Sequence, residues 1–130
     1  IQKACWALAK AGVSFEKKNP ITSLMSDIPT GTLREDIMNE KLMSAIVEIK
    51  VPVERTEEII RLVWEIEKQV DTVVALGVGT RCDETGDETV VAPILEKLGY
   101  SLQRAKTNTG LGRITNIVED AKPEVVGAAR

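Results

Sequence analysis

The residues best suited to bind a ligand follow the most apolar run of the chain. Residues 71–79 (DTVVALGVG) read as a strand that ends in Gly77 and Gly79, and Thr80 and Arg81 come directly after it. Glycines at a strand end let backbone N–H groups approach an anion closely, and the threonine and arginine add further donors. The spacing matches neither a P-loop nor the dinucleotide-binding motif. It predicts a phosphate-binding loop for a small anionic or phosphorylated metabolite, without naming the compound.

An acidic cluster follows this turn, consisting of Asp83, Glu84, Asp87 and Glu88. Carboxylates bind Mg²⁺ and act as general bases, so Asp83 and Asp87 are candidate ligand-binding residues. Carboxylates are also typical of the first turn of a helix, where the helix dipole favours negative charge. Cys82 lies in the same loop, but no histidine can activate its thiol and the neighbouring carboxylates oppose a thiolate. We therefore expect no catalytic role for Cys82.

A second glycine-bearing loop is expected at residues 108–113 (NTGLGR), where Thr109, Gly110 and Arg113 are the candidate ligand-binding residues. If the strand before this loop joins a parallel sheet, the loop faces the 77–88 loop across a cleft. The alternative is an ordinary surface turn.

Composition excludes several classes of function. The chain has no histidine, which removes the commonest metal ligand and the commonest general base, so zinc catalysis and histidine-activated nucleophiles are not expected. The net charge of −3 argues against nucleic-acid binding, and we take the local group Arg104, Lys106 and Arg113 as a solvated edge. No apolar run approaches the roughly 18 residues of a membrane span. Cys5 and Cys82 are interpreted as reduced thiols of a cytoplasmic protein.

The pattern of apolar residues predicts the elements that position these loops. Helices are expected at 1–12, with Cys5 and Leu8 inside, at 54–69, and from about Thr89 onwards, with Pro93 in the first turn. Strands are expected at 42–51, at 71–79, buried on both faces, and at 101–107. Residues 17–41 are rich in turn formers and read as a long loop with a short helix at 33–39.

The order of strand, helix and buried strand predicts a β-α-β unit with parallel pairing. We therefore expect one α/β domain over residues 1–130, with three layers and a mostly parallel sheet. The alternative is a ferredoxin-like α+β sandwich. Because the chain opens at Ile1 in helical periodicity, we also expect that an upstream segment has been lost. Trp64 lies away from the apolar face of its helix, which predicts packing against another subunit or another part of the chain.

Three segments resemble parts of known families. Residues 45–62 (AIVEIKVPVERTEEIIRL) resemble the second β-α half of P-II-like signalling proteins, which implies a trimeric ferredoxin-like module with 17–41 as its sensing loop. Residues 49–85 resemble the middle of lumazine synthases, but the histidine of that family is missing here. Residues 73–107 resemble the opening β-α-β of molybdopterin-binding domains. All three imply a ligand-facing loop after residue 77, and none is adopted as the family of this chain.

Two classes of function follow. The first is binding of a small anionic or phosphorylated metabolite at the 77–88 loop by a homo-oligomer, with catalysis and cofactor left open. The alternative is a non-catalytic, P-II-like regulatory module that acts on a protein partner through residues 17–41. A subunit that only builds an assembly is a third interpretation.

Overall fold

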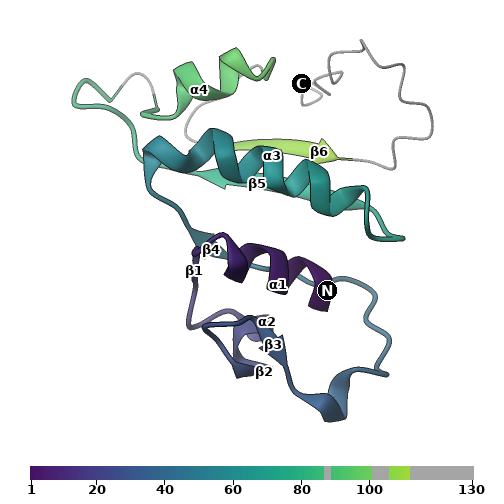
Figure 1. The fold of residues 1–130 in the computed structure, drawn as a ribbon. Coiled ribbons are helices and arrows are strands. Elements are labelled where there is room, and N and C mark those ends of the chain that lie inside the picture. The colour runs from purple at the N-terminus through teal and green to yellow at the C-terminus, as the bar shows by residue number, and fades with distance from the viewer. Residues whose placement is uncertain (87–88, 101–105, 112–130) are drawn as a thin grey trace.

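The computed structural model describes residues 1–86, 89–100 and 106–111 (Figure 1). These residues form an α+β arrangement of helices and short antiparallel sheets. In chain order the elements are α1 (Gln2–Lys10), β1 (Ser14–Phe15), α2 (Pro20–Ser23), β2 (Met25–Asp27), β3 (Thr32–Leu33), η1 (Glu35–Ile37), β4 (Ile49–Lys50), η2 (Val53–Arg55), α3 (Thr56–Glu67), β5 (Val74–Gly79), α4 (Ala92–Lys97) and β6 (Lys106–Leu111).

Strand pairing differs from the sequence-based prediction. Each sheet in the described chain has two antiparallel strands, β1 with β4, β2 with β3, and β5 with β6. The order β4, α3, β5 keeps the connectivity of the predicted β-α-β unit, but no backbone ladder joins β4 to β5. The described residues therefore show no three-layer parallel sheet. Helical periodicity is local in sequence, whereas strand pairing depends on residues far away in the chain. The apolar pattern therefore predicted the helices more accurately than the pairing of the strands.

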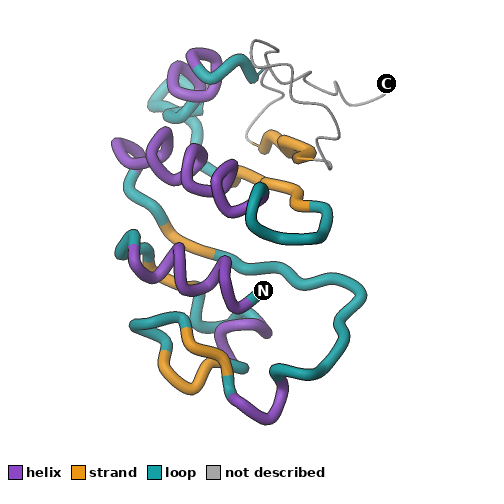
Figure 2. The backbone as a smooth tube through the Cα atoms, turned by 45° about the vertical axis from the view of Figure 1, so that its right-hand side comes forward, coloured by secondary structure: helices purple, strands orange, loops and turns teal. Residues whose placement is uncertain are grey.

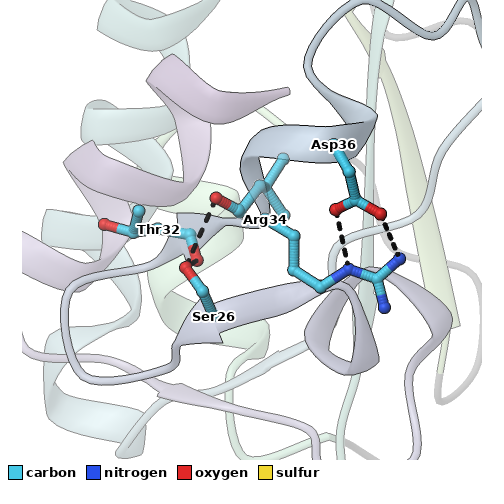
Figure 3. Close-up of polar contacts among 5 residues, drawn as sticks. Ser26, Thr32, Arg34 and Asp36 are labelled. Atoms are coloured by element: carbon cyan, nitrogen blue, oxygen red, sulfur yellow. Dashed lines mark hydrogen bonds and ion pairs between the residues drawn. The ribbon is translucent and has the colours of Figure 1, made fainter.

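The β2–β3 hairpin is held on α1 by a buried glutamine. The side-chain amide of Gln2 donates to the carbonyl of Gly31 at 2.8 Å and accepts from the amide of Leu33 at 2.7 Å. Within the hairpin, the Ser26 hydroxyl donates to the Thr32 carbonyl, and Arg34 pairs with Asp36 at its exit (Figure 3). Gln2 thus satisfies two backbone groups that burial would otherwise leave unpaired.

The prediction of a long loop at 17–41 was wrong, because this segment forms α2, β2 and β3, whereas the short helix expected at 33–39 is present as the 3-10 helix η1. The buried Asn19 caps α2, accepting from the amide of Ile21 at 2.9 Å, and its Nδ2 donates to Glu48 at 3.1 Å. Asn-Pro is a turn signal, but here the asparagine is an N-cap and Pro20 opens the helix.

The strand predicted at 42–51 is reduced to β4. Leu42, Met43 and Ile46 precede it without regular structure, and their exposed fractions are 54%, 104% and 70%. β-branched and apolar composition favours a strand only where a neighbouring strand is available.

Helix α3 lies between α1 and α4 (Figures 1 and 2) and contributes to two hydrophobic clusters. Ile59 and Ile66 pack with Cys5 and Leu8 in the first cluster. Ile60 packs in the second cluster with α4 residues and Tyr100. The predicted helix at 54–69 is confirmed as α3, but Ile60 adds a second buried face that the apolar pattern did not predict.

Trp64 packs against another part of the chain, one of the two outcomes expected for it. Its Nε1 donates to the Tyr100 hydroxyl at 3.0 Å, and the two ring centroids are 6.4 Å apart. Pro93 lies in the first turn of α4, as predicted.

Within the described part of the chain, strand β5 is covered on one face only, which corrects the prediction of burial on both. Val74, Leu76 and Val78 are half-buried, whereas Ala75, Gly77 and Gly79 are exposed. The helices of the described chain are all too short or too polar to cross a membrane.

Candidate functional site

A pocket of about 150 Å³ lies where β5 ends beside the start of α3. Its wall comprises Ile49, Val51 and Val53, three residues of α3 (Thr56, Ile59 and Ile60), residues 76–80, and Val91. Three residues predicted from the sequence, Gly77, Gly79 and Thr80, thus lie on one pocket. The remaining lining residues are aliphatic apart from Thr56. Several of them come from β4 and α3, whose positions are held by the two hydrophobic clusters.

Two threonines supply the polar side chains of the pocket. Thr56 is the first residue of α3, and Thr80 follows β5 directly. Both are half-buried. The Thr80 hydroxyl makes one long contact, 3.4 Å to the carbonyl of Arg81. Neither hydroxyl is committed to a short hydrogen bond within the described residues, so both can serve a bound ligand. Sequence reasoning missed Thr56, although a threonine opening an amphipathic helix is a recognisable helix-start signal.

The carboxylates at the start of α3 are neutralised by neighbouring cations. Glu57 accepts from Lys97 and from Arg61, each at 2.8 Å, and these contacts lower its pKa, with Lys97 the larger cause. Arg55 binds Glu58 through two nitrogens and lowers the pKa of that carboxyl. These pairs reduce the repulsion that an anion near the α3 N-terminus would otherwise meet.

Arg55 also fixes the position of the pocket wall. Its Nη2 donates to the carbonyl of Ala11 at 2.6 Å, which ties the start of α3 to the end of α1. Arg55, which directly precedes Thr56, thus contacts both α3, through Glu58, and the end of α1, through Ala11.

The loop after β5 does not gather the predicted residues around the pocket. Arg81 and Asp83 are exposed and outside the pocket lining. The Asp83 carboxylate accepts from the amides of Thr85 and Gly86 at 3.0 and 2.9 Å, and so closes its own turn. The described residues contain no group of three or more acidic, cysteine or histidine side chains that could hold a metal ion.

The prediction of a second loop at 108–113 (NTGLGR) was wrong for its first four residues, which lie in β6. Thr109 and Gly110 belong to β6, opposite Leu76 and Ala75. A glycine within a strand looks like a turn signal when the pairing partner is unknown. Asp87 and Arg113 lie outside the described residues.

The two cysteines differ in environment. Cys5 is fully buried, and burial raises its thiol pKa. Cys82 is exposed, and both are free thiols. Neither lines the pocket.

No family model, curated protein or solved structure matches this chain.

Proposed function

We propose that this chain binds a small anionic or phosphorylated metabolite in the pocket at the end of β5. The observation that supports the proposal is the meeting of Gly77, Gly79 and Thr80 with Thr56 around one pocket. Hydroxyl donors, glycine backbone and a helix N-terminus are groups that favour negative charge.

We propose binding at this pocket and no catalytic step. Apart from the threonine hydroxyls, the side chains described around the pocket are apolar. General acid–base catalysis needs a titratable group within hydrogen-bond reach of the substrate. The two free thiols favour a reducing compartment, which fits a cytoplasmic protein.

A thermal-shift experiment tests the proposal with wild type, Gly79→Val and Ala75→Val. A Cβ added at Gly79 meets no atom within 4 Å, so valine is accommodated there without straining the fold while it adds bulk at a residue that lines the pocket. Ala75 lies on the same exposed face of β5 but outside the pocket, which makes Ala75→Val the matched control.

The probes are inorganic phosphate, short alkyl carboxylates and phosphates, and AMP. A probe at about 100 times its Kd stabilises by about 2.7 kcal/mol. We expect one anionic probe to raise the Tm of wild type and Ala75→Val, and to raise that of Gly79→Val less. If no anion raises the Tm of wild type, or if all three proteins respond equally, the proposal fails.

A second candidate function is self-association through residues 42–46. Leu42, Met43 and Ile46 are more than half exposed, and apolar side chains grouped in this way commonly mark protein contacts. Light scattering on wild type and Met43→Glu tests it: an oligomer that the variant disrupts supports the candidate, and a monomeric wild type excludes it.

A further inference from the structure

The wall of the pocket is chemically uniform. Eight of its twelve residues are Ile, Leu or Val, and the other four are threonine or glycine. Among the described residues, no aromatic ring and no guanidinium lies on it. Nucleobases and similar flat rings gain much of their binding energy by stacking on such groups. The wall therefore suits a saturated hydrocarbon group better than a flat heterocycle.

The volume limits how much of a ligand can enter. Pockets for drug-sized ligands measure about 300–1,000 Å³, whereas this one measures about 150 Å³. An apolar cavity of about that volume holds a single benzene molecule. By that comparison about six non-hydrogen atoms fit inside, so the fused rings of a purine, pterin or flavin would enter only in part.

The charged end of a ligand must stay where it can be solvated. In the part of the chain that the structure describes, no charged side chain lines the pocket, and an ion buried without a partner is strongly disfavoured. The pocket is partly open to solvent, and the half-buried Thr56 and Thr80 supply its hydroxyls. An anionic group at the opening can bind these hydroxyls and remain hydrated while the apolar part fills the interior.

We propose that the ligand of this pocket is a short aliphatic chain of about four to six carbons that carries a terminal anionic group, either a carboxylate or a phosphate. This proposal rests on the function proposed above and narrows its ligand class.

Titration calorimetry with a graded series tests the chain. The probes are acetate, butanoate, 3-methylbutanoate, hexanoate and octanoate, with wild type, Gly79→Val and Ala75→Val as proteins. Burying one methylene group is worth about fourfold in affinity. We expect affinity to rise along the series up to the five- or six-carbon acid and then to level off at octanoate, in wild type and Ala75→Val alike, and to fall at least fivefold in Gly79→Val.

Three further probes test the terminal group and the ligand class. 3-Methylbutanamide should bind at least fivefold more weakly than 3-methylbutanoate. The affinities of 3-methylbutyl phosphate and 3-methylbutanoate, compared with each other, show whether the pocket prefers a phosphate or a carboxylate end. Equal binding of amide and acid would overturn the anionic end. Binding of AMP that Gly79→Val weakens, with no binding of the aliphatic series, would overturn this inference and leave the proposed function standing. Absence of binding by every anion, inorganic phosphate included, would overturn the proposed function itself.

Discussion

At the scale of single residues, Gly31 and Gly12 require glycine for different reasons. Both have positive φ, +69° and +71°. A Cβ at Gly31 would lie 2.5 Å from the carbonyl oxygen of Cys5, whereas one at Gly12 meets nothing within 4 Å. Gly12→Ala should therefore cost about 1–2 kcal/mol, the price of the left-handed backbone alone.

Gly31→Ala should cost about 1–3 kcal/mol more than Gly12→Ala, because it also pushes the hairpin away from α1. Urea denaturation of the two variants measures the difference. Equal losses would mean that the hairpin does not pack on α1 as described.

The two thiols should react at very different rates. Cys5 is fully buried with a raised pKa, and Cys82 is exposed. A thiol reagent at about pH 8 should modify one cysteine at once and the second only on unfolding. Cys82→Ser should remove the fast phase and Cys5→Ser the slow one. Rapid modification of Cys5 in native protein would contradict the packing of α1.

At the scale of elements, Glu57 links α3 to α4 through Lys97. Its pKa is lowered in the folded chain, so the unfolded chain holds the proton more tightly. The ion pairs therefore stabilise the fold above the ordinary pKa of glutamate, and this contribution is lost as the pH falls below it.

Glu57→Gln should accordingly make stability less dependent on pH between about pH 5 and about pH 3. Urea midpoints across this range measure the dependence. Glu67→Gln is the control, because it removes the same charge from α3. Among the described residues Glu67 forms no ion pair, so this variant should keep the wild-type dependence of stability on pH. An unaltered dependence in Glu57→Gln would show that the contact with α4 is not maintained in solution.

The elements also show what a sequence can predict. Helices α1 and α3 follow from periodicity, since residues three and four apart share a face whatever lies nearby. The pairing of β5 with β6 could not be predicted, because nothing in DTVVALGVG specifies its neighbour. For the same reason Thr109 and Gly110 were expected in a loop, although they pair with β5 as strand residues. Asn19 and Pro20 were recognised as turn formers, but the sequence pattern did not show that Asn19 accepts from the Ile21 amide as the cap of α2 while its Nδ2 donates to the distant Glu48.

At the scale of the whole molecule, α3 organises both the core and the pocket. Ile59 faces the first cluster and Ile60 the second, and both line the pocket together with Thr56. The strand-end half of the candidate site, Gly77, Gly79 and Thr80, could be picked out because it ends an apolar run. The aliphatic half could not, because it is brought together from four separate segments only by folding.

The most direct test of the proposed function is amide NMR of the uniformly ¹⁵N-labelled chain during titration with 3-methylbutanoate. We predict that the largest shift changes occur at the amides of Thr56, Gly77, Gly79 and Thr80, and that they saturate with one Kd. The amides of Asp83 to Gly86, in the turn outside the pocket, should change little. If 3-methylbutanoate and inorganic phosphate both leave the four pocket amides unchanged, or shift amides all over the surface without saturation, the pocket is not a binding site for small anions.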